Sequence, residues 1–332
     1  MIRPPWLWAT AVVTCALLSV GHAAATPPGA NGKLAFRRLF NSDHTWGAIF
    51  TSNPDGSGVR QITHPRRLVS DIKPDWSPDG RRIAFLRQSV NGCGPGCETT
   101  EIDTVGAEGA GLTRLAFDPP GKGCANGGPS RGGVCRGYPS WSPDGRQIAF
   151  PCDMAICVMQ SDGTNVHPLT QTPTPGLADS DPQWSADRTH IAFDRTVRDQ
   201  HSVFVMDADG GSQTQLTPWA MRAAQPDWSP DGKRIVFYSN FDGSPRVSAN
   251  LYTINADGSA LTQLTHAKGG TVQHLSASFS PDGRWIAFSR TPGVGRSGNA
   301  DVFVMRTDGT HVRNVTRSSI WDSGVDWGPR LH

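Results

Sequence analysis

Gln225-Pro226-Asp227-Trp228-Ser229-Pro230-Asp231-Gly232-Lys233-Arg234-Ile235-Val236-Phe237 is the stretch that decides the fold of this chain. It predicts a strand, a tight turn and a second strand. Ser suits the first position of a type I turn, Pro presets φ at the second, and Gly at the fourth can adopt the left-handed conformation that closes a short hairpin. The Ile-Val-Phe run supplies β-branched and aromatic residues, which favour a strand.

The same phrase recurs along the chain, each time after an aromatic residue that we call the anchor. The anchors are Trp76, Trp141, Trp184, Trp228, Phe279 and Trp327. The copy at Trp184 is degraded to Ser185-Ala186-Asp187, and the copy at Trp327 has no second strand after it. Successive anchors lie 43 to 65 residues apart. The shorter spacings match the length of one four-stranded propeller blade.

Each repeat continues with a third strand, an Asp-Gly hairpin and a fourth strand that ends in Leu-Thr or a similar pair. The first repeat starts directly at a second strand, over 31–36, and residues 323–327 supply the missing first strand from the other end of the chain. We therefore predict an all-β, six-bladed β-propeller, closed by pairing of the C-terminal strand with the N-terminal blade. Closure of this kind leaves no open sheet edge.

The repeats resemble the WD40-like repeat of the TolB propeller family, often called PD40. The resemblance rests on Trp-Ser-Pro-Asp-Gly followed by Ile-Ala-Phe, on the third strand that ends in Asp-Gly, and on the Leu-Thr ending. It covers essentially all of the chain after the N-terminal segment. TolB itself resembles a two-domain protein with an α/β domain ahead of the propeller. Here only about five residues separate the predicted signal peptide from the first strand.

The N-terminus has the features of a secretory signal peptide: Arg3, an apolar run from Trp6 to Val20, and then Ala23-Ala24-Ala25. We predict a signal peptide over 1–25, a single propeller domain over 26–332, and export to the periplasm, the cell envelope or the extracellular space. One alternative is an uncleaved anchor, because the apolar run is nearly long enough to span a bilayer. Another is lipidation at Cys15. No transmembrane domain is expected in the mature chain.

Six cysteines remain after Cys15 is set aside, and an even number in an exported chain favours disulfides. Six cysteines allow 15 pairings. We expect the local one, which joins Cys93 to Cys97, Cys124 to Cys135, and Cys152 to Cys157. The Cys-x2-Cys spacing typical of a zinc site is absent.

Polar residues at two positions of each repeat are the candidates for a ligand site. In a propeller the short turns lie on one face, and the long irregular loops of this chain fall on the other. The residue five before each anchor should lie where the first strand of the blade leaves this loop-rich face, near the central channel. With the neighbouring polar positions, the candidates are Asp71, Lys73, Arg136, Tyr138, Asp179, Asp181, His274 and Asp322.

The carboxylates of this set have two interpretations. Several of them around one channel mouth can bind a divalent cation or a basic group of a partner, with Asp71, Asp179 and Asp322 acting together. Alternatively, each Asp caps its own loop through the backbone, as in an Asx-turn. We expect no other cofactor.

Several function classes lack support in the sequence. The formal net charge is +2 and no basic stripe is present, so nucleic-acid binding has no electrostatic basis. Residues 128–132 match Gly-x-Ser-x-Gly, but they lie in a glycine-rich loop rather than between a strand and a helix. The Asp of each Ser-Pro-Asp-Gly turn recurs once per repeat, which is typical of a turn residue rather than a catalytic one. The anchors are interpreted as packing wedges between blades.

Two functions remain. The first is a non-catalytic, exported and monomeric binding scaffold that recognises a protein or cell-envelope ligand on its loop-rich face. The second is a propeller enzyme, a lyase or hydrolase that acts on a saccharide or lactone with a metal in the channel. His274, Asp71, Asp179 and Asp322 are its candidate residues. Such a metal needs several converging ligands. Only one His is among the candidates, so the sequence favours binding.

Overall fold

The computed structural model describes residues 29–41, 44–90, 98–117, 137–171, 176–198, 200–240, 248–270, 272–293 and 298–331. The predicted signal peptide, Cys15, Arg136 and the Gly-x-Ser-x-Gly match lie outside these ranges. So do the two predicted disulfides Cys93–Cys97 and Cys124–Cys135. Within the described ranges the only helix is one turn of 3-10 helix, η2 (Trp219–Met221), and no helix is long and apolar enough to cross a membrane.

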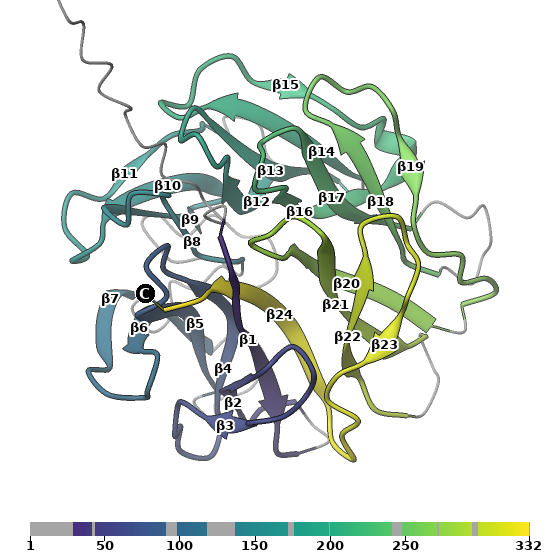
Figure 1. Cartoon of the computed structure of the whole chain (residues 1–332). Helices are drawn as coiled ribbons and strands as arrows, with labels where there is room; N and C mark the ends of the chain where they lie inside the picture. Colours follow the sequence, from purple (N-terminus) through teal and green to yellow (C-terminus); the bar gives the residue numbers. More distant parts are fainter. Residues whose placement is uncertain are drawn as a thin grey trace, which may run out of the picture.

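The strands form antiparallel groups of four arranged around a common centre (Figure 1). The first group contains β24 (Asp322–Pro329), β1 (Asn31–Leu39), β2 (Gly47–Ser52) and β3 (Arg60–Gln61). The second contains β4 (Val69–Trp76), β5 (Arg82–Val90), β6 (Glu98–Gly106) and β7 (Thr113–Phe117). One parallel bridge, between Gly47 and Ser70, joins these two groups into an eight-stranded sheet.

The other groups are separate four-stranded sheets. The third contains β8 (Ser140–Trp141), β9 (Gln147–Cys152), β10 (Ala155–Gln160) and β11 (His167–Pro168). The fourth contains β12 (Leu177–Trp184), β13 (His190–Val197), β14 (Gln200–Asp207) and β15 (Thr214–Gln215). The fifth contains β16 (Ala223–Trp228), β17 (Arg234–Ser239), β18 (Asn250–Asn255) and β19 (Thr262–Gln263). The sixth contains β20 (Val272–Phe279), β21 (Trp285–Pro292), β22 (Asp301–Arg306) and β23 (Arg313–Asn314).

The Ser-Pro-Asp-Gly turns form as the sequence indicates. Ser229 Oγ donates to Asp231 Oδ1 at 2.6 Å, and the same Asp231 oxygen accepts the Lys233 N–H at 3.1 Å. Gly232 has φ of 67° and donates its N–H to the Ser229 carbonyl at 2.8 Å. The repeated Asp is therefore used by the turn itself, which explains its regular occurrence without any catalytic role.

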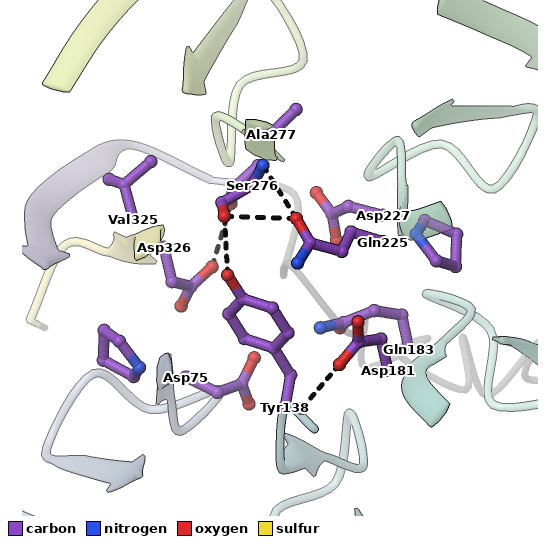
Figure 2. A pocket seen from close by; sticks show the side chains of 13 residues that line it. Asp75, Tyr138, Asp181, Gln183, Gln225, Asp227, Ser276, Ala277, Val325 and Asp326 are labelled. Atoms are coloured by element: carbon purple, nitrogen blue, oxygen red, sulfur yellow. Dashed lines mark hydrogen bonds between the residues drawn. The ribbon is translucent and has the colours of Figure 1, made fainter. Parts of the chain in front are cut away.

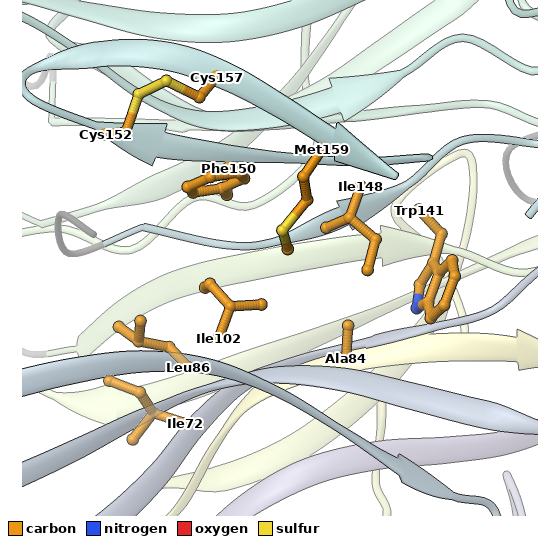
Figure 3. Close-up of a cluster of buried hydrophobic side chains, with 10 residues drawn as sticks. All are labelled: Ile72, Ala84, Leu86, Ile102, Trp141, Ile148, Phe150, Cys152, Cys157 and Met159. Atoms are coloured by element: carbon orange, nitrogen blue, oxygen red, sulfur yellow. A yellow bond between two sulfur atoms is a disulfide. The ribbon is translucent and has the colours of Figure 1, made fainter. Parts of the chain in front are cut away.

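Apolar side chains fill the space between neighbouring groups. Between the second and third groups, Leu86 and Ile102 face Ile148, Phe150 and Met159 (Figure 3). The structure also joins Cys152 to Cys157 across the β9–β10 hairpin, beside this cluster, which is the third of the expected local pairs.

The anchors act through apolar packing, because each is at least 94 % buried. Among the described residues, the indole N–H groups of four anchor tryptophans have no hydrogen-bond partner: those of Trp76, Trp141, Trp184 and Trp327. A phenyl ring can therefore replace the indole at Phe279, which is fully buried, without loss of a hydrogen bond.

The two ends of the described chain lie in the same group of strands. β24 pairs antiparallel with β1, with Leu34 opposite Trp327 and Arg38 opposite Asp322, and the two strands lie side by side in Figure 1. The Trp76 N–H in β4 donates to Asp326 Oδ2 at 2.8 Å. The C-terminal strand thus contacts both the first and the second group.

Candidate functional site

A β-bulge in the innermost strand of most groups turns one side chain toward the centre. In β4, Ile72 pairs with Leu86 and Asp75 pairs with Ala84, so that Lys73 and Pro74 together oppose one residue. Proline cannot donate to a ladder, and a bulge re-aims the side chain beside it. The equivalent residues, three before each anchor, form what we call the channel ring: Lys73, Tyr138, Asp181, Gln225, Ser276 and Gly324.

The backbone of the channel ring is unusual. Four of its non-glycine residues adopt the left-handed conformation, with φ between 49° and 55°: Lys73, Asp181, Gln225 and Ser276. This conformation costs an L-residue about 1–2 kcal/mol. Strain of this kind persists where the surrounding structure enforces it, and it is concentrated at functional sites.

The Tyr138 side chain extends from one side of the centre toward Ser276 on the other side (Figure 2). Its hydroxyl donates to Ser276 Oγ at 2.7 Å, and Ser276 in turn donates its N–H to Gln225 Oε1 at 3.1 Å. On the other side, Lys73 Nζ lies 3.1 Å from Asp181 Oδ1 and 4.5 Å from the centre of the Tyr138 ring. Burial raises the pKa of Tyr138 well above its ordinary value, so the phenol stays protonated.

A second ring, the linking ring, lies one residue before the anchors and holds Asp75, Ser140, Gln183, Asp227, Ser278 and Asp326. Five of its side chains accept the backbone N–H of the next anchor, and at the sixth position the backbone carbonyl of Gln183 accepts the Trp228 indole N–H at 3.1 Å. Trp141 donates to Asp75 at 2.8 Å, and Phe279 donates to Asp227 at 2.7 Å. Trp184 and Trp327 donate to the hydroxyls of Ser140 and Ser278.

The two rings enclose a chamber of about 20 Å³, which has room for roughly one water molecule. Three carboxyl groups of the linking ring face one another across it (Figure 2). Burial raises the pKa of Asp75, Asp227 and Asp326, and the charge of Asp326 raises the pKa of the other two further. The chamber therefore favours neutral carboxyl groups.

The candidates five residues before the anchors lie elsewhere. Asp71, Asp179 and Asp322 are buried in their sheets, and none of them lines the chamber or the cavity described below. Each receives two hydrogen bonds of 2.6 to 2.9 Å from the guanidinium opposite it on the next strand. The pairs are Asp71–Arg87, Asp179–Arg195 and Asp322–Arg38.

In the described structure these three carboxylates do not meet at the channel, because each is paired with its cross-strand arginine. The hydrogen bonds of the described residues include no Asx-turn at these positions. Burial still raises the pKa of Asp71 and Asp322, because it outweighs the effect of the guanidinium. His274 occupies the same position in β20, opposite Arg290, and burial lowers its pKa to about 4. Arg136 lies outside the described residues.

The structure brings together Lys73, Tyr138 and Asp181, and adds residues that the sequence analysis did not single out. On the loop-rich side of Tyr138 lies a cavity of about 290 Å³, which we call the mouth cavity. Its lining contains every channel-ring residue except Asp181, together with residues such as Arg37, Gln273 and Trp321. Tyr138, Gln225 and Ser276 line both the mouth cavity and the chamber, so they separate the two.

The donor set of the described residues does not match a metal centre. No group of three or more His, Cys, Asp or Glu side chains in the described ranges is arranged to hold an ion. The three carboxyl groups of the linking ring that line the chamber already accept anchor N–H groups.

The chamber predicts a pH-dependent stability. Because the folded pKa of Asp227 is raised, the folded state binds more protons than the unfolded state, and stability falls as pH rises from the ordinary carboxyl value through the raised one. Asp227→Asn keeps an oxygen for the Phe279 N–H but carries no charge. We expect it to be more stable than the wild type at pH 7.5, because it avoids the cost of a charged, buried carboxylate, and the difference should shrink toward pH 5. Urea unfolding at pH 5 and pH 7.5 measures this.

Asp231→Asn, in the turn of the same group, is the matched control. Partial burial alone raises the pKa of Asp231, but hydrogen bonds from Ser229 and the Lys233 N–H outweigh it and lower the pKa. This substitution should therefore lower stability at pH 7.5, and the loss should shrink as pH falls below the ordinary carboxyl pKa. If the Asp227 side chain instead makes the wild type more stable at pH 7.5 than at pH 5, the assignment of a raised pKa to Asp227 is wrong.

Comparison with known proteins places this geometry in context. The TolB beta propeller domain (PD40) matches residues 152–331, more than half of the chain. TolB from Anaeromyxobacter dehalogenans is 31% identical over 139 residues, which is 42% of this chain and 29% of that protein. An uncharacterised protein of Agrobacterium fabrum is 26% identical over 185 residues, 55% of this chain and 59% of that protein. The matches thus span well under two thirds of these relatives.

Solved structures share the fold. TolB from Acinetobacter baumannii superimposes with a TM-score of 0.70 at 19% identity, covering 90% of this chain and 67% of that one. Oligogalacturonate lyase from Vibrio parahaemolyticus gives a TM-score of 0.52 at 14% identity, covering 77% and 70%. At these identities the likeness concerns the fold alone. The domain match, together with the repeated turns and four-stranded groups, shows that this chain belongs to the TolB β-propeller family.

Proposed function

We propose that this chain is an exported, monomeric binding scaffold, and that its ligand, a protein or another component of the cell envelope, docks at the mouth cavity on the loop-rich face. The observation that carries the proposal is the mouth cavity itself. It is about 290 Å³ in volume, at the small end of ligand pockets, and its floor is made of hydrogen-bonded polar side chains on rigid strands.

A closed six-bladed ring is part of this proposal. The six repeats carry equivalent channel-ring and linking-ring residues, and hydrogen bonds of the linking-ring residues connect each group to the next. The bond from Trp76 to Asp326 connects residues 250 positions apart and so bridges the two ends of the ring. The domain bounds belong to the proposal too: a signal peptide over 1–25 and one propeller over 26–332.

Binding is favoured over catalysis by the chemistry of the cavity. Among the described residues, its lining contains Lys73 and Arg37 but no carboxylate or His that can serve as a general base. Tyr138, the most central group, is a phenol whose raised pKa keeps it protonated. The alternative, a metal-assisted lyase or hydrolase on a saccharide or lactone, needs converging ligands. His274 is buried against Phe288, and its candidate partners are each held by an arginine.

A site-specific cross-linking experiment tests the docking face. A photo-reactive benzoylphenylalanine replaces Gln273, which lines the mouth cavity, or Lys233, which lies on the opposite face in a Ser-Pro-Asp-Gly turn. After illumination of cells that export the protein, Gln273 should yield a discrete cross-linked product and Lys233 should not. Equal products from both positions, or none from Gln273, reject the mouth as the docking site. Turnover of an oligouronide that is lost in His274→Ala favours the enzyme instead.

A further inference from the structure

One arginine at the mouth cavity differs from its neighbours in the sheets. Arg37 in β1 donates through Nη2 to Ser323 Oγ at 2.8 Å, and within the described residues it forms no ion pair. The adjacent Arg38 holds Asp322 through two hydrogen bonds of 2.7 Å. Arg87 and Arg195 hold carboxylates in the same way. Arg37 alone of these four guanidinium groups lines the mouth cavity and has no carboxylate partner.

Within the part of the chain that the structure describes, no carboxylate compensates the charge of Arg37. Burial lowers the pKa of Arg37, which shows that the folded protein disfavours its cation, although the group stays protonated. The described residues that line the mouth cavity include no Asp or Glu. Its second cation, Lys73, has a carboxylate partner in Asp181, which lies in the chamber lining below. A largely buried and unpaired cation is costly unless an anion from outside joins it.

Two serine hydroxyl groups that line the mouth cavity with Arg37 can also donate hydrogen bonds into it. Ser323 Oγ accepts two hydrogen bonds, from Arg37 and from the Trp321 indole at 3.1 Å. Ser289 Oγ accepts the Gly324 N–H at 2.9 Å. Because a hydroxyl oxygen with its lone pairs engaged can still donate its proton, both serines can donate to a ligand in the cavity that they line. The described lining therefore offers donors for an acceptor-only group.

We propose that the mouth cavity binds a carboxylate of a peptide, held in the fork of Arg37 and by the Ser289 and Ser323 hydroxyls. The inference rests on the proposed binding function and names the chemistry of its ligand. A carboxylate matches the planar guanidinium through two parallel hydrogen bonds, the geometry that Arg38, Arg87 and Arg195 already adopt. Ile72, Leu275 and Pro292 provide apolar walls for the aliphatic part of the residue.

The size of the mouth cavity favours a peptide over an acidic oligosaccharide. A volume of about 290 Å³ is at the lower limit of small-molecule pockets, which hold roughly 300–1,000 Å³. It accommodates one residue and part of its neighbours, whereas several sugar rings need a longer groove. The carboxylate can belong to an acidic side chain or to a chain terminus, and short peptides separate these two sources.

Peptide titration of the purified protein, followed by NMR, tests the proposal. The probes are acetyl-Ala-Glu-Ala-amide, its Gln counterpart, and acetyl-Ala-Ala-Ala with a free C-terminus. We expect the Glu peptide or the free C-terminus to bind at least about tenfold more tightly than the Gln peptide, since hydrogen bonds to a charged group are the stronger ones. Whichever carboxylate peptide binds identifies the source. Equal binding of the Glu and Gln peptides with no binding of the free terminus overturns the proposal, as does no binding at all.

Arginine variants test whether the peptide carboxylate binds at Arg37. Arg37→Gln can keep a bond to Ser323 but loses the charge and the fork, and should weaken binding about tenfold or more. Arg37→Lys keeps the charge and should recover only part of the affinity. Arg290→Gln removes one charge from an exposed arginine next to Ser289 and should bind like the wild type. Melting temperatures confirm that each variant is folded. An equal loss in Arg290→Gln shows a general charge effect and rejects the site.

Two results separate this inference from the proposed function. If Gln273 gives a discrete cross-link but peptides bind equally well with and without a carboxylate, the proposed docking face is supported and the proposed carboxylate site is rejected. Binding of digalacturonate that depends on Arg37, without binding of any peptide, also rejects the inference and assigns the cavity to an acidic sugar.

Discussion

Removal of residues 323–332 is expected to leave a chain that does not fold stably at 25 °C. The deletion removes nearly all of β24, including Val325 and Trp327, which are 97 % buried. It also removes the acceptor for the Trp76 N–H and exposes the edge of β1. Loss of one buried Trp side chain costs about 3–5 kcal/mol, and the whole domain is stable by only about 5–15 kcal/mol. Circular dichroism and light scattering should show unfolding or aggregation.

A shorter deletion is the control. Removal of residues 330–332 keeps β24 intact and loses only the backbone bond from Arg330 to Ala30 at this end. This variant should melt within a few degrees of the full chain. If the longer deletion melts at the same temperature as the shorter one, β24 does not complete the first group and the closed ring is wrong.

Arg195→Met should have the second largest effect, a loss of about 3–5 kcal/mol in the free energy of unfolding. It leaves the fully buried Asp179 carboxylate without the two hydrogen bonds of 2.6 and 2.8 Å that neutralise it. The double variant with Asp179→Leu replaces both charges by apolar groups and should recover much of the loss, because a buried pair stabilises little relative to well-packed apolar residues. A double-mutant cycle in urea measures the coupling.

Arg114→Met provides the matched control, since Arg114 pairs with Glu101 at 3.4 Å with more than half of its side chain exposed. This change should cost less than about 1 kcal/mol. Adding millimolar calcium or manganese should not rescue Arg195→Met through an Asp179 site. A metal-dependent rise in melting temperature that requires Asp179 would falsify the view that this carboxylate only pairs with Arg195 and binds no metal.

The fold was largely predictable because its signals are local. A turn such as 229–232 is specified by four consecutive residues, and its hydrogen bonds span at most five positions. Repetition of this unit then predicted the four-stranded groups. Pairing of β1 with β24 followed from a missing strand at one end and a surplus strand at the other.

The candidate site was less predictable, because it depends on register and on bulges. The Asp71–Arg87 and Asp179–Arg195 pairs are each 16 residues apart, and only strand alignment places them opposite one another. That repeated spacing was a readable signal. The proline after Lys73, Tyr138, Asp181 and Gln225 was another, because a proline inside a strand indicates a bulge. No comparable sequence signal identifies Arg37, because it differs from the other arginines in having no carboxylate partner among the described residues.

The pairing of β24 with β1 has a consequence for how the protein is made. β1, β2 and β3 are synthesised before the other described groups, whereas β24, which pairs with β1, follows all of those groups in the chain. Domains generally fold as units during synthesis, and contacts that are distant in sequence form slowly. The first group of strands thus lacks one of its members until β24 has been made, so that the edge of β1 stays open while the other groups are synthesised.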